Sequence, residues 1–149
     1  MSAQRSQAIE IKESNIETVV ALSQQIPEFI DPHGAEEYHR RLTGVRHLIL
    51  VAFVENKPVG FKVGYEREGY FYSWMGGVLQ DFRQMAIAKA LADEQEAWAK
   101  KSGYTTITFK TRNSHKGMLI FALKNGFDII GFEPSAHTPS HRILLRKQL

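Results

Sequence analysis

The sequence predicts an α+β (α/β) domain, with a mixed, mostly antiparallel sheet of about seven strands flanked by about four helices. Two observations predict this class. Three apolar strand patterns follow one another between His47 and Val78 with short turns between them, which is typical of an antiparallel meander. After Val78, helical and strand patterns alternate, as in crossover units. With 149 residues, the chain is long enough for one core, and we expect a single domain over residues 1–149.

The composition is that of an ordinary globular protein, with 43% hydrophobic and 23% charged residues. The sequence contains no cysteine, which excludes disulfides, thiolate metal sites and a cysteine nucleophile. The first seven residues are polar, unlike a signal peptide, and the longest apolar run, Leu48 to Val54, is too short to cross a bilayer. We therefore expect a cytoplasmic protein that does not bind membranes.

The formal net charge of +3 and the pI of about 9.2 would help to attract a polyanionic ligand, although a charge of this size also serves solubility. Nucleic-acid binding would need a basic face or a recognised module. A nucleic-acid-binding function rests on pI alone, and we expect none.

The first elements have clear boundaries in the sequence. A weakly alternating strand covers Ala8 to Ile11, and the capping-box pattern at Ser14 and Glu17 starts a helix that ends by Ile26-Pro27. Turn residues fill Pro27 to Gly34, and Ala35 to Leu42 forms a second short helix.

Three strands follow. The predicted ranges are His47 to Val54, Val59 to Tyr65 and Tyr70 to Val78, with turns at Glu55 to Pro58 and Glu66 to Gly69. The third strand carries Gly76 and Gly77, and a glycine pair indicates either a bulge or a frayed strand end.

The second half alternates helices and strands. A long helix that ends near Gly103 has Ile87, Leu91 and Trp98 along one line. Its start is open, because Asp81 with Gln84 forms a capping pair that would place the first helical residue at Phe82.

The remaining elements complete the order βαα-βββ-α-β-α-ββ. Thr105 to Lys110 alternates as a strand, and Asn113 or Ser114 caps a helix that closes at Asn125-Gly126. The apolar face of that helix is Met118, Phe121, Ala122 and Leu123. A strand at Phe127 to Phe132, a loop at Pro134 to Ser140 and a strand at Ile143 to Leu145 follow.

The stretch from Val78 to Leu91 joins a strand to the long helix and has the features of an anion-binding turn. The first N–H groups of a helix have no internal partner and attract anions, provided that the side chains around them are small. Ala86 and Ala88 are small, and Arg83 adds a charge that suits phosphate geometry. Alternatively, the alanines simply pack against the sheet.

This stretch resembles the acetyl-CoA motif of the GCN5-related N-acetyltransferase (GNAT) family. The residues that carry the resemblance are Val78-x-Gln80-x-Phe82-Arg83-x-x-Ala86-x-Ala88-x-x-Leu91. Gln80 replaces a common proline, and Gln84, Ala86 and Ala88 stand where glycines are common. A second segment, Asn113 followed by a helix and Asn125-Gly126-Phe127, resembles another family signature with slightly longer spacing. The order of elements also matches over nearly the whole chain.

The resemblance implies a GNAT-like acyl-CoA N-acyltransferase fold, in which a bulge at Gly76 and Gly77 separates the fourth and fifth strands for the coenzyme's pantetheine arm. It also implies that backbone donors hold the phosphates and the thioester. Asn113 would contact the coenzyme arm, or it would simply cap a helix. The expected coenzyme-binding residues are Gly77, Val78, Leu79, Arg83, Gln84, Met85, Ala86, Ile87, Ala88, Lys89 and Asn113.

The catalytic residues stay open. Many relatives place a tyrosine acid where this chain has Ala122, so the thiolate leaves unassisted, another group protonates it, or catalysis is impaired. Tyr72 stands where some relatives have a glutamate base, and Glu66 and Glu68 are nearby carboxylates that could equally be solvated turn residues. A chain of water molecules could also take the proton.

The resemblance implies transfer of acetyl from acetyl-CoA to a primary amine of a small molecule or peptide, by direct attack in a ternary complex. The alternative is an acyl-CoA-binding or interaction protein with impaired catalysis. By analogy, the substrate pocket would include Phe29, His33, Tyr70, Tyr72 and Trp74. We expect no metal, because the six histidines show no ligand spacing. Relatives often dimerise through strand edges, which makes a homodimer conceivable.

Overall fold

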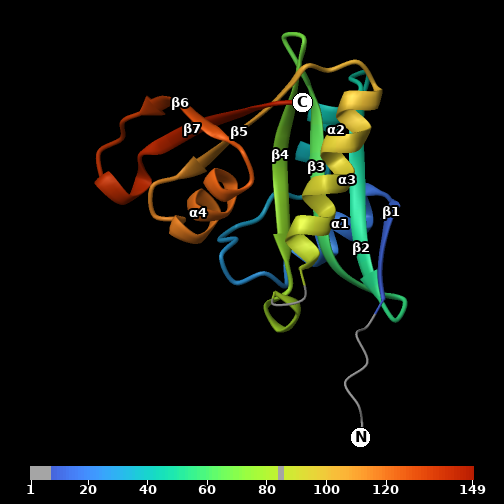
Figure 1. The fold of residues 1–149 in the computed structure, drawn as a ribbon. Coiled ribbons are helices and arrows are strands. Elements are labelled where there is room, and N and C mark those ends of the chain that lie inside the picture. Colours follow the sequence, from blue (N-terminus) through green and yellow to red (C-terminus); the bar gives the residue numbers. More distant parts are fainter. Residues whose placement is uncertain (1–7, 84–85) are drawn as a thin grey trace, which may run out of the picture. The chain divides into compact units, whose positions relative to one another are not determined.

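The computed structural model describes residues 8–83 and 86–149 (Figure 1). Contacts between Cα atoms divide the chain into two compact units. The first unit contains the chain up to Tyr65 together with Met75–Gln95, and the second contains Glu66–Trp74 and Glu96–Leu149. Each unit is described by itself below.

The order of elements agrees with the predicted order, and the predicted fold class is confirmed: the described residues form a mixed seven-stranded sheet with four α-helices. The strand order in the sheet is β1-β2-β3-β4-β5-β7-β6. The elements are β1 (Ile9–Glu13), α1 (Ile16–Ser23), α2 (Ala35–Leu42), β2 (His47–Val54), β3 (Lys57–Arg67), β4 (Tyr70–Val78), η1 (Gln80–Phe82), α3 (Ile87–Lys101), β5 (Thr106–Arg112), α4 (Lys116–Lys124), β6 (Asp128–Glu133), η2 (Thr138–Ser140) and β7 (Arg142–Gln148).

The first unit is built on the antiparallel strands β1, β2 and β3. In Figure 1, the part of α3 that belongs to this unit, up to Gln95, lies along one face of these strands, and α1 and α2 lie on the other face. The strand β2 is almost entirely buried, as its continuous apolar run predicts, and Val51 and Ala52 have no exposed surface.

The turn between β2 and β3 is shorter than predicted. Glu55 and Asn56 both have positive φ, 50° and 66°, which is the geometry of a two-residue hairpin turn. Lys57 and Pro58 therefore belong to β3 and not to the turn. The prediction that the turn extends to Pro58 is wrong, because the two residues Glu55 and Asn56 complete the reversal of the chain.

The start of α1 also differs from the prediction. The N-cap is Asn15, whose Oδ1 accepts hydrogen bonds from the Thr18 N–H (2.9 Å) and the Thr18 hydroxyl (2.8 Å). Ser14 instead uses its backbone N–H to bond the Ile49 carbonyl. The helix ends at Ser23, and turns continue to Ile26.

In the second unit, β5 runs parallel to β4 with Phe71 opposite Ile107, and β7 pairs antiparallel with both β5 and β6. The side chain of Phe71 packs on Trp98 and Tyr104, with ring centroids 5.4 Å apart in both pairs. Phe71 and Tyr104 are buried, so these two rings belong to the core of the unit.

The helix α4 differs from the prediction in its N-cap residue and in the burial of its apolar face. Its N-cap is His115, whereas Asn113 donates from Nδ2 to the Thr138 carbonyl (3.3 Å) and accepts from Lys116 Nζ (3.0 Å). Ala122 is buried, but Met118 is 41% and Leu123 is 48% exposed, so the predicted apolar face is only partly covered.

The end of α4 is as predicted. Gly126 has a φ of 92°, and the Phe127 N–H donates to the Ala122 carbonyl (3.0 Å), which is the glycine-dependent helix stop. Across the described ranges, no helix has both the length and the apolar character that a bilayer crossing requires.

Candidate functional site

The junction between β4 and α3 begins with a short 3-10 turn. Phe82 lies in η1, with its N–H donated to the Leu79 carbonyl (2.9 Å), and α3 starts only at Ile87. The alternative that starts the helix at Phe82 is therefore wrong, and a loop precedes the helix. Gln84 and Met85, two of the expected coenzyme-binding residues, lie outside the described residues.

The first turn of α3 has the features that favour an anion. The N–H of Ala90 donates to the Ala86 carbonyl (3.1 Å), so the N–H groups of Ile87, Ala88 and Lys89 precede this first intrahelical bond. Within α3, the first turn has no acidic residue, and the small side chain of Ala88 is exposed. The positive end of the helix dipole is therefore accessible to a ligand.

The backbone of Ala86 and the side chain of Lys89 also bear on this turn. Ala86 has a φ of 61°, the left-handed conformation that favours glycine, and its side chain is exposed. Lys89 forms an ion pair with Asp93 one turn along the helix, with 2.6 Å between Nζ and Oδ1. The charge of Lys89 is therefore partly balanced within the helix.

The end of β4 is held closely against β3. The Leu79 N–H donates to the Val59 carbonyl (2.8 Å), so this N–H is not available to an incoming carbonyl group. A Cβ on Gly60 would lie 3.2 Å from the Gly77 carbonyl oxygen. Gly60 therefore permits the close approach of the two strands.

The loop between α1 and α2 packs on the same strand end. A Cβ on Gly77 would lie 2.7 Å from Ile26 Cδ1 and 3.4 Å from Phe29 Cε2. Ile26 is 4% exposed, and the Phe29 ring lies 6.3 Å from the Phe61 ring. The absence of a side chain at Gly77 thus makes room for the loop. Phe29, an expected substrate residue, is brought to the expected coenzyme residue Gly77.

Arg83 connects this loop to the junction. Its Nε donates to the Val78 carbonyl (3.0 Å), and its Nη1 and Nη2 atoms each lie 2.7 Å from a carboxylate oxygen of Glu28. The carboxylate raises the pKa of Arg83. Glu28 is a residue that the sequence analysis missed, because it lies 55 residues from its partner and carries no local motif.

Except for His33, the other candidates for the site belong to the second unit. Asn113 lies between β5 and α4, and its N–H donates to the His141 carbonyl (2.7 Å). The expected widening between β4 and β5 involves Gly76 and Gly77 of one unit and β5 of the other, and it stays a prediction.

Three of the four aromatic residues of β4 occupy one side of that strand. Because side chains alternate, Tyr70, Tyr72 and Trp74 face away from the side on which Phe71 packs. Tyr72 is buried, and the guanidinium of Arg67 lies 4.8 Å from the centre of its ring.

The two candidate carboxylates differ in their surroundings. Glu66 accepts a hydrogen bond of 2.6 Å from the Tyr104 hydroxyl. Glu68 lies in the turn before β4 with a φ of 49°. The assignment of a base to Tyr72, Glu66 or Glu68 stays a prediction.

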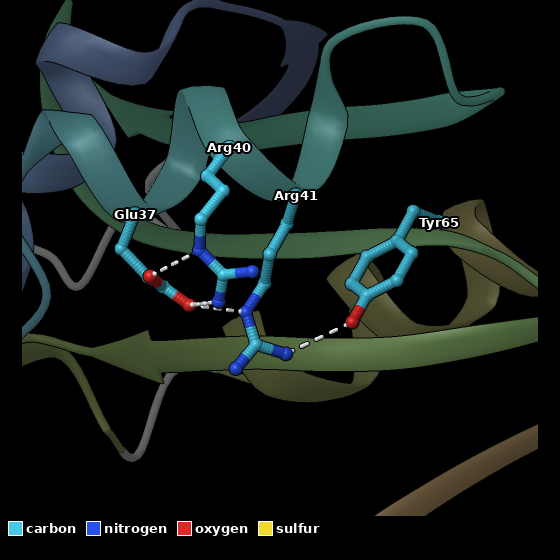
Figure 2. A network of polar contacts seen from close by, with 4 residues as sticks. All are labelled: Glu37, Arg40, Arg41 and Tyr65. Atoms are coloured by element: carbon cyan, nitrogen blue, oxygen red, sulfur yellow. Dashed lines mark hydrogen bonds and ion pairs between the residues drawn. The ribbon is translucent and has the colours of Figure 1, made fainter.

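A polar network fixes α2 to the end of β3 in the first unit. Figure 2 shows Glu37 accepting from both Arg40 and Arg41, while Arg41 donates to the Tyr65 hydroxyl (2.9 Å). The hydrogen bond from Arg40, followed by that from Arg41, lowers the pKa of Glu37 to about 2. This network anchors the helix that follows the α1–α2 loop.

His33, the remaining expected substrate residue, lies in that loop. Its ring meets the ring of Tyr38 edge-on, with centroids 6.5 Å apart. Burial raises the pKa of Tyr38 to about 12. Among the described residues, no group of three or more His, Asp or Glu side chains is placed to hold a metal ion.

Comparison with known families gives one match. A family model described as the acetyltransferase (GNAT) family matches residues 16–127, which is more than half of the chain. A comparison with curated protein sequences finds no match.

Several solved structures have a similar fold. The ribosomal-protein-S18-alanine N-acetyltransferase from Escherichia coli has a TM-score of 0.82 at 15% identity, over 95% of this chain and 94% of that chain. Ard1 from Thermoplasma volcanium has a TM-score of 0.80 at 19% identity, over 95% and 98%. The PaiA N-acetyltransferase from Thermoplasma acidophilum, solved in complex with coenzyme A, has a TM-score of 0.78 at 18% identity, over 95% and 99%. At these identities the likeness shows the fold alone.

Proposed function

Because this chain belongs to the acetyltransferase (GNAT) family, we propose that it transfers the acetyl group of acetyl-CoA to a primary amine of a small molecule or peptide. The observation that carries the proposal is the accessible first turn of α3. It combines backbone N–H groups ahead of the first intrahelical bond, an exposed small side chain at Ala88 and no acidic residue.

The residues at this turn fit a coenzyme with phosphate groups. The N–H groups of Ile87, Ala88 and Lys89 would hold phosphate oxygens, and the helix dipole would favour the negative charge. Acetyl-CoA would supply an activated thioester carbonyl. A backbone N–H group at the end of β4, from Gly77 or Val78, would polarise that carbonyl. The Leu79 N–H is already bonded to the Val59 carbonyl.

The amine would attack the thioester directly, because the sequence has no cysteine that could carry the acetyl group. The new C–N bond forms, the C–S bond breaks, and the amine proton passes to a base. Tyr72, Glu66, Glu68 or a chain of water molecules is the candidate base.

A second candidate function is acyl-CoA binding without turnover. Ala122 is buried and cannot donate a proton to the leaving thiolate. A protein that keeps the coenzyme site but lacks this acid would bind acetyl-CoA and transfer the acetyl group poorly.

The decisive experiment is calorimetric binding of acetyl-CoA to the wild type, to Ala88→Glu and to Ala97→Glu. The carboxylate at position 88 would stand in the anion site, so we expect about tenfold weaker binding or worse. The control places the same exposed charge further along α3, and we expect wild-type affinity. Equal weakening in both variants, or no binding by the wild type, would contradict the proposal.

A screen of primary amines for release of the free thiol of CoA then separates the two functions. Thiol release that depends on the amine identifies an acetyltransferase. Tight binding without thiol release over a broad screen favours the second function.

A further inference from the structure

The ion pair between Arg83 and Glu28 uses the geometry by which arginine binds phosphate. Both terminal nitrogens of Arg83 lie 2.7 Å from separate oxygens of one carboxylate. A phosphate group presents two oxygens to a guanidinium in the same forked arrangement. The Glu28 carboxylate thus occupies the face of Arg83 that a phosphate would use.

The position of Glu28 does not depend on its partner. Ile26 and Phe29, on either side of it, both pack at Gly77, and the Phe29 N–H donates to the Ile26 carbonyl (3.1 Å). Ile26 is almost fully buried. The loop therefore holds the backbone of Glu28 near Arg83 through contacts that do not involve the ion pair.

The pair itself is exposed to solvent. The side chain of Arg83 is 37% exposed and that of Glu28 is 50% exposed. Ion pairs at this level of exposure contribute little free energy, and they exchange readily with other ions. A ligand with more than one negative charge would compete well for the same guanidinium.

Arg83 also stays near the coenzyme residues while it is paired. Its Nε donates to the Val78 carbonyl (3.0 Å), so the guanidinium is fixed at the end of β4. Glu28 and a phosphate would thus compete at one fixed place.

We propose that Glu28 is a built-in competitor for the coenzyme's phosphate groups: it occupies Arg83 in the free protein, yields to the bound coenzyme, and takes Arg83 back when CoA leaves. This inference rests on the proposed coenzyme-binding function. The competition by Glu28 would lower the affinity of the protein for both acetyl-CoA and CoA, and it would speed the dissociation of the product CoA.

The test is the Glu28→Gln variant, which keeps the shape of the side chain and removes its charge. We expect acetyl-CoA and CoA to bind about threefold more tightly, since removing an exposed ion pair frees the guanidinium for the phosphate. Calorimetry gives the affinities, and stopped-flow displacement of CoA is expected to show a slower dissociation rate.

Glu13→Gln is the matched control, because it removes the same charge from an exposed position on β1. We expect it to leave the affinity unchanged, which separates a local effect from the change in net charge. In the Arg83→Gln background, Glu28→Gln is expected to give no gain, because the shared partner is gone.

Hydrogen exchange at the Phe29 amide checks that the loop keeps its packing in Glu28→Gln. Unchanged or weaker coenzyme binding by Glu28→Gln, or an equal gain in the Arg83→Gln background, would overturn the competition while leaving the proposed function intact. Failure of the wild type to bind either acetyl-CoA or CoA would overturn both.

Discussion

At the scale of single residues, Ala86 adopts a backbone conformation that costs free energy. Its φ of 61° places the Cβ close to the neighbouring carbonyl oxygen, a conformation that glycine adopts without this clash. The same residue starts the first hydrogen bond of α3. The helix start is therefore formed at the expense of local strain.

We predict that Ala86→Gly stabilises the protein by about 1 kcal/mol, because the strain at this position exceeds the extra chain entropy of glycine. Urea unfolding measures the change. Ala90→Gly, one turn into α3, is the control and should destabilise by about 1 kcal/mol. Equal destabilisation by the two substitutions would contradict the strain argument.

Glu37 provides a pH-dependent contribution to stability. Its pKa is lowered from 4.5 to about 2 by Arg40 and Arg41, so the unfolded state binds more protons in this range. The contribution is fully present above the unfolded pKa and is lost as the pH falls through the folded pKa. Removing the carboxylate should therefore lower the stability of the protein at neutral pH and leave it unchanged in strong acid.

We predict that Glu37→Gln lowers Tm at about pH 6 and that the difference from the wild type shrinks steadily toward about pH 2.5. Circular dichroism melts over this pH range give the comparison. Glu36→Gln, which changes the adjacent exposed residue of the same helix, should show a smaller difference at pH values around neutrality. A gap between Glu37→Gln and wild type that widens in acid would refute the assignment.

At the scale of elements, α1 shows how two adjacent cap candidates are resolved. The sequence pattern around Ser14 and Glu17 predicts a capping box, but Asn15 makes the side-chain bond to the Thr18 N–H. Ser14 is drawn to β2 through its bond to the Ile49 carbonyl. A contact between elements thus shifts the helix start by one residue.

We predict that Asn15→Ala costs about 1 kcal/mol of stability, since it removes the capping acceptor. Ser14→Ala should be nearly neutral, because the Ser14 contact to β2 uses only backbone atoms. Chemical denaturation of both variants tests the correction directly. A larger loss of stability in Ser14→Ala than in Asn15→Ala would instead support the capping box at Ser14.

At the scale of the whole molecule, three elements run through both compact units. The strand β3 passes from one unit to the other at Tyr65 and Glu66, and β4 does so at Trp74 and Met75. The helix α3 does so at Gln95 and Glu96. A unit that unfolded alone would have to break two continuous strands and a continuous helix. We therefore propose that residues 1–149 fold as a single cooperative domain.

We predict that the protein unfolds in a single transition, which two different spectroscopic probes should report at the same urea concentration. Trp74 and Trp98 both lie in the second unit, so tryptophan fluorescence reports on that unit, whereas far-UV circular dichroism reports on both. We expect the two urea transitions to coincide within error. Separate midpoints would show that the units unfold independently.

Much of the fold was predictable from the sequence because its signals are local. Apolar runs gave β2 and β4 with their exact bounds, and Ala35–Leu42 was predicted as α2 without error. The stop at Gly126 was predictable because a positive φ there demands glycine. Bounds failed where two-residue turns lengthened β3, since turn type depends on how the strands pair.

The sequence by itself determined the order of elements and the small-residue start of α3, because periodicity and side-chain size are properties of neighbours along the chain. Only the tertiary structure decided which residues contact the residues of the candidate site. The bond from Leu79 to Val59, the packing of Ile26 on Gly77 and the pairing of Glu28 with Arg83 join segments distant in sequence. Such contacts form only when the chain is folded, because the residues that make them are far apart in the sequence. A local sequence pattern therefore cannot predict them.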